Sequence, residues 1–536
     1  YLPLNIEIFL YIVMKSFYDH LRTRLEFGEQ VSDTRKPILR SSGIFPVIKN
    51  KNFSSRILFM GYWLLKRNIP EVGIIITLRS DIGKILLRKL QTIHSSKAFS
   101  IELDSLLSEI NVTSDFLGSL EIEFNTTRDM VFPYPALVLE YFGNDFSTCV
   151  HTIERIYNDF EDLNENEQFK VPESGFDIHC NDDLNSFFAF VNGPLKNQDG
   201  IVEYTVTNSK SKKLTGLFHL NSIHPYETKF IKIHEHIPEL KSFLDDYSGS
   251  ISLSHNFEGF YPRLLVGNMQ NSFPSVSFTH SYYDCTSCNS ESDFWSRIND
   301  DFYDSSVYVP LFLTDDFFTN LVIYPNFSPS DFCIQIDLYN KAGEKIHGLN
   351  NFMTIKSQES KLIKIDFKKI IDDLNLDKNL VSSAHIITKF LSSKIPSRIK
   401  FGLNVGIEKS KSKLPCNICF NAKVGNPSID SKPGSFHWTP VFVQNSVITI
   451  SNFSPKKNYE KNATIELNFY RKEDSATISK KIQLKPFSEF RLTLDNDLKN
   501  FLKEDGWVTI KSDNPYIQGF YFVFHSSGSV AGDHFF

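Results

Sequence analysis

The chain has 536 residues, which is too long for one hydrophobic core, so we expect about three to five domains. With 41% hydrophobic and 22% charged residues, it has the composition of an ordinary soluble globular protein. A net charge of −6, with Lys and Arg scattered along the chain, argues against a nucleic-acid-binding protein, which would need a basic stripe. Its seven cysteines form no dense framework, so we expect a reducing compartment and a cytoplasmic protein.

The first stretch, residues 1–13, is apolar, but it is too short to span a bilayer and is broken by Glu7. It also lacks the basic region of a signal peptide. We interpret it as a fragment edge or an over-extended reading frame, and we expect no membrane span. Apolar residues spaced four apart then predict a helix over residues 14–30, within an N-terminal segment and linker that covers residues 1–42.

Four sequence features then recur with a period of about 130 residues, which indicates tandem repeats. The first is an opening strand that contains Pro, such as Phe45-Pro-Val-Ile48. The second unit lacks this Pro, and we expect Phe187-Phe-Ala-Phe190 to be its counterpart. The second feature is a turn, seen as the identical tetrapeptides Asn326-Phe-Ser-Pro329 and Asn452-Phe-Ser-Pro455.

The third feature is an alternating strand that ends in a polar residue before a short helix-like run. We expect that polar residue to be the helix N-cap, because a carboxylate can accept hydrogen bonds from the unpaired N–H groups of the first turn. The four residues at this place are Asp104, His234, Asp366 and Asp495. The fourth feature is a pair of strands, of which the second follows a Pro.

Each unit therefore contains about seven or eight short strands with alternating polarity and a turn signal roughly every 8–12 residues, which predicts a β-sandwich. The predicted fold class is all-β: four tandem β-sandwich repeats of about 130 residues, each with one short helix, preceded by an N-terminal helix. The predicted repeats span residues 43–160, 184–290, 305–425 and 434–536.

The fourth unit carries a family resemblance. A strand ends in Asn within 447–454, a strand that ends in an aromatic pair covers 463–470, and a Pro-bearing turn lies within 482–494. A Ser-Asp-Asn-Pro turn within 508–517 precedes the last strands. This order resembles the small β-sandwich of the sensory-rhodopsin-transducer family, which implies a cytoplasmic, oligomer-forming module that binds carbohydrate or a protein partner. The chain departs from that family in having four units and an N-terminal helix, and no catalytic residues carry over.

The last strand of each unit also recurs, and three of the four copies contain His in the same place: His151, His280 and His534, with Asn421 in the third unit. An Asp lies near each His, and a His–Asp pair at a strand end can bind a hydroxyl-rich ligand. The candidate ligand-binding residues are therefore His151, Arg155, Asp159, His280, Asp284, Asp533 and His534. The alternative is that each His satisfies a neighbouring backbone, and repetition favours that alternative.

Two patterns raise the question of a metal. His234 and His236 would share one face if their strand continued, so they are the candidate metal ligands of the second unit. The two C-x2-C pairs, Cys285–Cys288 and Cys416–Cys419, have the spacing of a four-cysteine zinc site. Cys416 and Cys419 lie three apart within a predicted strand and so point to opposite faces, whereas Cys285 and Cys288 follow a strand, and we interpret these cysteines as buried or incidental thiols.

The sequence contains no nucleophile elbow, P-loop, dinucleotide fingerprint or H-E-x-x-H motif. We therefore predict a binding or assembly protein without catalytic activity or cofactor, which recognises carbohydrate, a surface-polymer precursor or a protein partner and forms a homo-oligomer. One alternative is a metal-dependent enzyme centred on His234 and His236. Another is a structural scaffold that connects proteins.

Overall fold

The structure is a computed structural model, and it describes most of the chain from Pro37 to the C-terminus. The described residues are 37–151, 153–156, 171–174, 176–245, 248–255, 257, 260–261, 263–283, 294–297, 300–359, 361–396 and 399–536. Strands dominate these residues and the longest described helices have seven residues, so the predicted all-β class is confirmed. The helix predicted over 14–30 lies outside the described residues.

Among the helices of the described ranges, none is both long and apolar enough to cross a bilayer.

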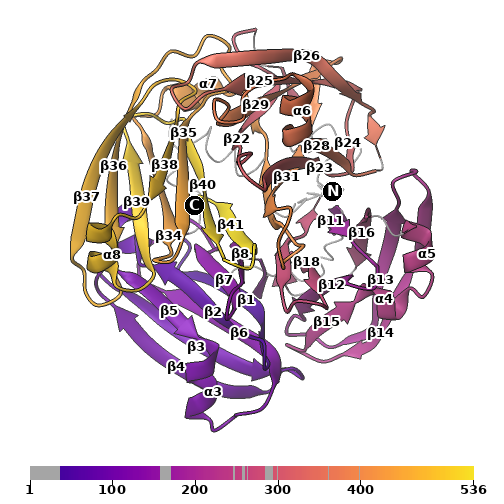
Figure 1. Ribbon diagram of the computed structural model, residues 1–536. Helices are drawn as coiled ribbons and strands as arrows, with labels where there is room; N and C mark the ends of the chain where they lie inside the picture. The colour runs from indigo at the N-terminus through magenta and orange to yellow at the C-terminus, as the bar shows by residue number, and fades with distance from the viewer. Residues whose placement is uncertain are drawn as a thin grey trace, which may run out of the picture.

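In the described part of the chain, eight antiparallel sheets of four or more strands follow one another as four successive pairs (Figure 1). The first sheet pair combines the order β1-β6-β3-β4 with the order β5-β2-β7-β8. Its elements are β1 (Arg40–Lys49), β2 (Phe53–Met60), α2 (Tyr62–Lys66), β3 (Val72–Ser80), β4 (Ile85–Ile93), β5 (Ala98–Glu102), α3 (Leu103–Glu109), β6 (Phe116–Asn125), β7 (Leu137–Gly143) and β8 (Ser147–His151).

The second sheet pair combines the order β14-β13-β16-β10-β20, with β11 beside β16, and the order β15-β12-β18-β19. Its elements are β10 (Val171–Ser174), β11 (Phe176–Ile178), β12 (Leu184–Val191), β13 (Asn197–Thr207), β14 (Lys213–Ile223), β15 (Thr228–Lys232), α4 (Ile233–His236), α5 (Leu240–Leu244), β16 (Gly249–His255), β18 (Leu265–Gln270), β19 (Val276–His280) and β20 (Tyr282–Tyr283).

The opening strand of the second pair is β11, so the assignment of Phe187-Phe-Ala-Phe190 to that role was wrong. β11 pairs with β16 as β1 pairs with β6, and Asp177 occupies the register position that Pro46 holds in the first pair. Residues 187–190 lie instead in β12, the counterpart of β2. Without the Pro, this strand had no marker in the sequence. The second sheet pair begins before residue 184, because β10 and β11 belong to it.

The third sheet pair combines the orders β26-β25-β29-β22-β33 and β28-β23-β31-β32. Its elements are β22 (Ser305–Pro310), β23 (Phe317–Ile323), β25 (Phe332–Tyr339), β26 (Lys345–Ile355), β28 (Ile363–Asp366), α6 (Phe367–Asp373), β29 (Ser383–Phe390), β31 (Lys400–Ile407), β32 (Cys416–Asn421) and β33 (Lys423–Val424). Two-stranded pairings join β9 (Arg155–Ile156) with β17 (Phe260–Tyr261), β21 (Phe294–Ser296) with β30 (Lys394–Pro396), and β24 (Asn326–Phe327) with β27 (Gln358–Glu359).

The fourth sheet pair combines the orders β34-β39-β36-β37 and β38-β35-β40-β41. It follows the short helix α7 (Pro427–Asp430). Its elements are β34 (Ser435–Val441), β35 (Ser446–Asn452), β36 (Ala463–Tyr470), β37 (Thr477–Leu484), β38 (Glu489–Thr493), α8 (Asn496–Leu502), β39 (Gly506–Ser512), β40 (Ile517–Phe524) and β41 (Val530–His534).

Two of the four expected N-caps are confirmed. Asp366 and Asp495 each accept a hydrogen bond from the third backbone N–H of their helix, at 3.1 and 2.9 Å. The helices α3 and α4 begin at Leu103 and Ile233, two residues earlier than expected, so Asp104 and His234 lie in the first turn and the two helices have no side-chain cap. Asp104 instead forms an ion pair with Lys49, at 2.6 Å.

The four sheet pairs form a ring, and each contributes an edge strand of a four-stranded sheet to its centre, as β8 and β41 show (Figure 1). We call β8, β19, β32 and β41 the closing strands. β8 contacts both β19 and β41, and β32 contacts the same two strands, so the circuit of closing strands is complete. The first and last sheet pairs therefore lie side by side although they are farthest apart in the sequence.

One contact type recurs around the ring. The tip of a hairpin in one sheet pair accepts a hydrogen bond from the first backbone N–H of a strand in the next pair. This contact links the first pair to the second, the third to the fourth, and the fourth to the first. The bonds are Thr228 N–H to Asp81 O at 2.8 Å, Glu489 N–H to Lys341 O at 3.1 Å, and Ala98 N–H to Arg471 O at 3.1 Å. Head-to-tail contacts of this kind close a ring when the rotation between units permits.

Two of these hairpin tips require glycine. Gly83 and Gly343 have φ angles of +82° and +84°, which side chains rarely adopt. A Cβ atom on Gly83 would lie 2.2 Å from the carbonyl oxygen of Pro225, and one on Gly343 would lie 2.3 Å from that of Pro486. Both glycines therefore permit the close approach of one sheet pair to the next.

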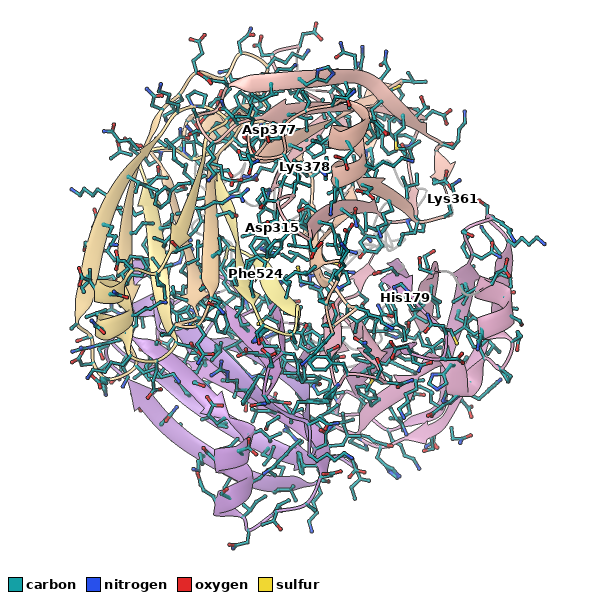
Figure 2. All side chains as sticks on the ribbon, viewed as in Figure 1. His179, Asp315, Lys361, Asp377, Lys378 and Phe524 are labelled. Atoms are coloured by element: carbon teal, nitrogen blue, oxygen red, sulfur yellow. The ribbon has the colours of Figure 1, made fainter. Side chains whose placement is uncertain are left out.

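Apolar side chains continue from one sheet pair into the next. One core cluster includes residues of both the first and the fourth pair, and the third-pair cluster includes Phe520 and Phe522 of the fourth. Phe524, labelled in Figure 2, packs its ring against Phe312 and Phe317 of the third pair, with centroid distances of 5.4 and 5.3 Å. Burial of apolar surface thus stabilises the junctions as well as the individual pairs.

Candidate functional site

The closing strands bring the recurring sequence position to the centre of the ring. β8 ends at His151, β19 at His280, β32 at Asn421 and β41 at His534. We call these four the axial residues. Each closing strand is antiparallel to the strand that precedes it, and the shared pattern of alternating side chains places the same position at the same end of every strand.

The structure gathers three of the axial residues and one neighbouring carboxylate into a cluster. The ring of His151 lies 4.6 Å from the ring of His280 and 4.6 Å from that of His534, between centroids. The carboxylate of Asp533 lies 2.9 Å from Nδ1 of His151 and also accepts a bond of 2.8 Å from the His151 backbone N–H. All four residues are among the ligand-binding candidates predicted from the sequence.

The proton positions in this cluster follow from its hydrogen bonds. Nη1 of Arg263 lies 3.4 Å from Nε2 of His151. A guanidinium group can only donate, so Nε2 is the acceptor and Nδ1 carries the proton that is donated to Asp533. The neutral imidazole of His151 thus connects the Arg263 guanidinium to the Asp533 carboxylate.

The charges of this pair follow from its surroundings. Burial lowers the pKa of His151 below its usual range, although the carboxylate of Asp533 opposes that shift. Burial alone would raise the pKa of Asp533, but His151, His534 and the hydrogen bonds to the carboxylate outweigh it and lower that pKa. The pair therefore consists of a neutral imidazole and an ionised carboxylate near neutral pH.

The other two axial histidines bond to the backbone next to them. Nδ1 of His280 donates to the carbonyl oxygen of Ser281 at 2.9 Å, and burial lowers the pKa of His280 well below its usual range. Nδ1 of His534 donates to the carbonyl oxygen of Phe535 at 2.8 Å. His280 is only 4% exposed, so His151 and His280 meet in the interior rather than in an open groove. These contacts match the alternative in which the recurring His satisfies neighbouring backbone.

The remaining candidates of the set do not join this cluster in the described residues. Arg155 lies in β9 with its side chain buried, and its guanidinium carbon is 5.9 Å from the ring centroid of Tyr134. Asp159 and Asp284 lie outside the described residues.

The second-unit histidines do not share a face as expected. His234 and His236 lie in helix α4 rather than in a continued strand. Two residues apart on a helix corresponds to a rotation of about 200°, so the two side chains point in nearly opposite directions. The ring of His236 meets that of Phe218 edge-on at 5.7 Å. Among the described residues, the group with three metal-ligating side chains close together is His151, Asp533 and His534.

The described cysteines of the C-x2-C pairs lie in the interior. Cys416 and Cys419 are both in β32, and they belong to different core clusters on opposite faces of the strand, as the sequence predicts. Burial raises the pKa of Cys416 to about 12, which keeps the thiol protonated. Cys285 and Cys288 lie outside the described residues.

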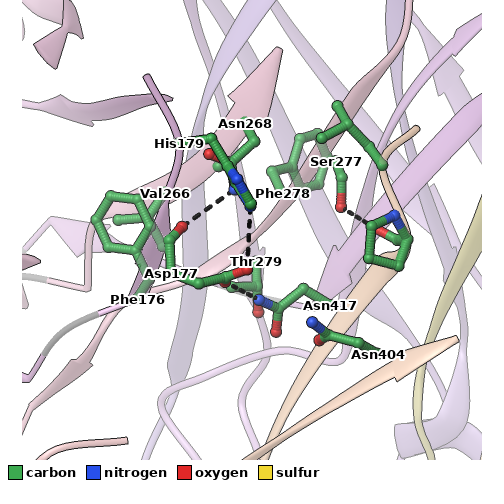
Figure 3. A pocket seen from close by; sticks show the side chains of 13 residues that line it. Phe176, Asp177, His179, Val266, Asn268, Ser277, Phe278, Thr279, Asn404 and Asn417 are labelled. Atoms are coloured by element: carbon green, nitrogen blue, oxygen red, sulfur yellow. Dashed lines mark hydrogen bonds and ion pairs between the residues drawn. The ribbon is translucent and has the colours of Figure 1, made fainter. Parts of the chain in front are cut away.

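A small polar pocket lies between the second and third sheet pairs (Figure 3). One carboxylate oxygen of Asp177 accepts a bond of 2.7 Å from the Asn417 side chain, and the other lies 3.8 Å from Nε2 of His179. Oδ1 of the buried Asn404 has no hydrogen-bond partner among the described residues. The pocket has room for about one water molecule, so it is too small for a sugar.

Two residues that are important in the structure were not predicted from the sequence. Arg263 sets the proton position on His151, and Asp177 joins the second pair to the third. The available signal for Arg263 was its position directly after the recurring Pro, where the other units have Ala136, Ser397 and Tyr516.

No family model and no curated protein matches this chain. Among solved structures, one similar chain is a crystal structure of a tetra-tandem repeat in the extending region of a large adhesion protein. The match covers 87% of this chain and 91% of that chain, at 7% identity and a TM-score of 0.10. A TM-score this low carries no argument about fold or function.

Proposed function

We propose that this protein is a non-catalytic assembly scaffold, a ring of β-sheet pairs that holds protein partners on its outer strands. The observation that carries the proposal is that the residues with the right chemistry for a site act as joints of the ring. His151 bonds to Asp533 of the fourth sheet pair, and its ring packs against that of His280 of the second pair, 4.6 Å away between centroids. Groups that are fully engaged inside a joint are poorly placed to receive a substrate.

The junctions support a rigid scaffold. The side chain of Arg56, in the first sheet pair, donates to Asp505 of the fourth pair at 2.8 Å. Tyr62 of the first pair stacks on Trp438 of the fourth, with ring centroids 4.4 Å apart. Such mixed polar and aromatic contacts between packed elements hold the sheet pairs at fixed relative positions, which a scaffold requires.

The outside of the ring supports protein binding. In the described part of the chain, β4, β14, β26 and β37 each form the edge of a sheet, so one side of each backbone lies outside the ladder. On β4, the side chain of Leu90 is 74% exposed, and Ile85 and the neighbouring Ile82 are also exposed. An extended segment of a partner protein can add to such an edge and pack on these side chains.

The resemblance of the fourth unit to the sensory-rhodopsin-transducer family supports the same proposal, because it implies an oligomer-forming binding module. The burial of His280 and the engagement of His151 count against the carbohydrate alternative at the axial residues. The position of His234 and His236 on opposite sides of α4 counts against the metal-enzyme alternative.

A peptide-display selection against the full chain tests the proposal. Enriched extended peptides should bind Leu90→Lys at least tenfold more weakly, while the matched control Leu391→Lys, at a position 70% exposed in the third sheet pair, should bind within twofold of wild type. Peptides that bind Leu90→Lys as tightly as wild type would contradict the proposal. A glycan-array signal removed by His151→Gln would favour the carbohydrate alternative instead.

A further inference from the structure

In the axial cluster, two atoms that can each accept a hydrogen bond lie near each other: Nε2 of His534 and Oδ1 of Asp533. A carbonyl oxygen only accepts, so Nδ1 of His534 carries the proton that it donates to Phe535, and Nε2 of the same ring has a lone pair. This Nε2 lies 3.9 Å from Oδ1 of Asp533, which accepts a bond of 2.8 Å from the His534 backbone N–H. The two atoms are too far apart for a hydrogen bond, and their separation leaves room for a metal ion with bonds of about 2 Å.

A third ligand atom completes a metal-binding geometry. His151, Asp533 and His534 each offer one ligand atom, and these atoms all lie within 4.8 Å of one another. Two imidazole nitrogens and a carboxylate oxygen form the ligand set of many zinc sites, with bonds of about 2.0–2.2 Å and a free fourth position. The donation from Nδ1 of His534 to a backbone carbonyl is also the second bond that orients metal-binding histidines.

From this geometry we propose that His151, Asp533 and His534 bind one divalent first-row transition-metal ion, with Zn²⁺ as the best match. The ion bridges Nδ1 of His151, a carboxylate oxygen of Asp533 and Nε2 of His534. The exposed part of the His534 side chain, 31% of it, gives the ion a path from solvent. Imidazole and carboxylate ligands suit Zn²⁺ better than the hard cations Mg²⁺ and Ca²⁺.

Metal binding requires a proton to move on His151. The proton on Nδ1 is transferred to Nε2, so the ring stays neutral and no proton is released overall. Nε2–H then faces Nη1 of Arg263, which is also a donor, so the bond of 3.4 Å between them is lost and the guanidinium turns away. Metal binding and the Arg263–His151 hydrogen bond are therefore mutually exclusive. Because this bond must break first, Arg263 lowers the affinity of the site for the metal.

The position of the site gives the ion a structural role. Asp533 and His534 belong to the last strand of the ring and His151 to β8 of the first sheet pair, 382 residues from Asp533. A bound ion therefore joins the two ends of the described ring. This inference does not rest on partner binding at β4, so the two proposals can fail separately.

Chelator-treated full-length protein titrated with Co²⁺ tests the site, because four-coordinate Co²⁺ with nitrogen and oxygen ligands has a strong visible absorption band. We expect one Co²⁺ per chain, displacement of the band by Zn²⁺, and a rise in the melting temperature on Zn²⁺ addition. His534→Gln, which leaves the His151–Asp533 bond in place, should weaken binding at least thirtyfold, and Arg263→Gln should strengthen it about tenfold.

His94→Gln is the matched control, because His94 is an exposed histidine of the first sheet pair and should leave the affinity unchanged. Equal binding by wild type and His534→Gln overturns the proposal. The lack of a Co²⁺ absorption band in the wild-type protein also overturns it.

Discussion

The Nδ1 atom of His151 donates a hydrogen bond of 2.9 Å to the carboxylate of Asp533, although the two residues are 382 positions apart. The same carboxylate accepts from the backbone N–H of His151. This pair joins the first closing strand to the last, and it is one of several contacts by which the first and fourth sheet pairs close the ring. The axial cluster is therefore a joint first, and any ligand chemistry there acts through the joint.

Substitution of Asp533 tests how much the joint contributes. In Asp533→Asn the ionised acceptor is lost. We expect the free energy of the first unfolding transition in denaturant to fall by about 1.5–3 kcal/mol, as for other hydrogen bonds to a charged group. Asp497→Asn, at an exposed site in α8 of the same sheet pair, should change stability by no more than about 0.5 kcal/mol. Equal effects of the two substitutions would show that the joint contributes little.

The hairpin tips make a second prediction. Gly83→Ala introduces a Cβ atom 2.2 Å from a backbone oxygen at a φ of +82°, so we expect a loss of more than about 1 kcal/mol in the free energy of unfolding. Gly73→Ala is the control, because its Cβ would lie 3.6 Å from the carbonyl oxygen of Asn125, an ordinary contact. Thermal denaturation of the two variants measures the difference, and equal melting temperatures would contradict the close approach.

A buried histidine predicts the acid response. Burial, with a contribution from Lys345, lowers the pKa of His385 to about 3. In the unfolded chain the value is about 6.5, so between these values the unfolded state binds more protons. Stability is complete above pH 6.5 and should fall by about 1.4 kcal/mol per pH unit as the pH drops toward 3. In His385→Phe this part of the dependence should vanish, as denaturation at several pH values can show. An unchanged pH profile would contradict the assignment.

The thiols predict a labelling pattern. Cys149, Cys416 and Cys419 are buried, and burial raises the pKa of Cys149 well above its usual range. Thiolate is the reactive form, so we expect these three cysteines to resist alkylation in the native protein, while the partly exposed Cys333 reacts before them. Peptide mass spectrometry after brief labelling checks the order. Rapid labelling of Cys416 and Cys419 without denaturant would show that β32 is open.

Local patterns predicted what depends on local chemistry. The strands, the N-caps at Asp366 and Asp495, and the recurring His were all readable from the sequence, because alternation and capping act over a few residues. The second opening strand was missed because Asp177 replaces the marker Pro. The prediction that His234 and His236 share one face was wrong because the strand ends and a helix begins one residue before His234.

The function of the axial position could not be read in this way, because it depends on ring closure. The Asp that bonds to His151 lies at the other end of the chain, and no local pattern relates the two. The role of Arg263 has the same origin, since it reaches His151 from the second sheet pair. Contacts between distant segments arise only when the sheet pairs pack together, so sequence periodicity predicted the position but not its partners.

The closed ring is the central claim, and cross-linking of its two ends tests it most directly. The carboxylate of Asp145, in the turn before β8, accepts hydrogen bonds from the backbone and hydroxyl of Ser526, in the turn before β41, at 3.1 and 2.8 Å. In the variant Asp145→Cys with Ser526→Cys, a short bifunctional thiol reagent should join these two peptides within one chain at high dilution. The control pair Asp145→Cys with Ser211→Cys should give no such product. Failure to form the 145–526 link, or its formation only between two chains, would contradict a ring closed by the first and last sheet pairs.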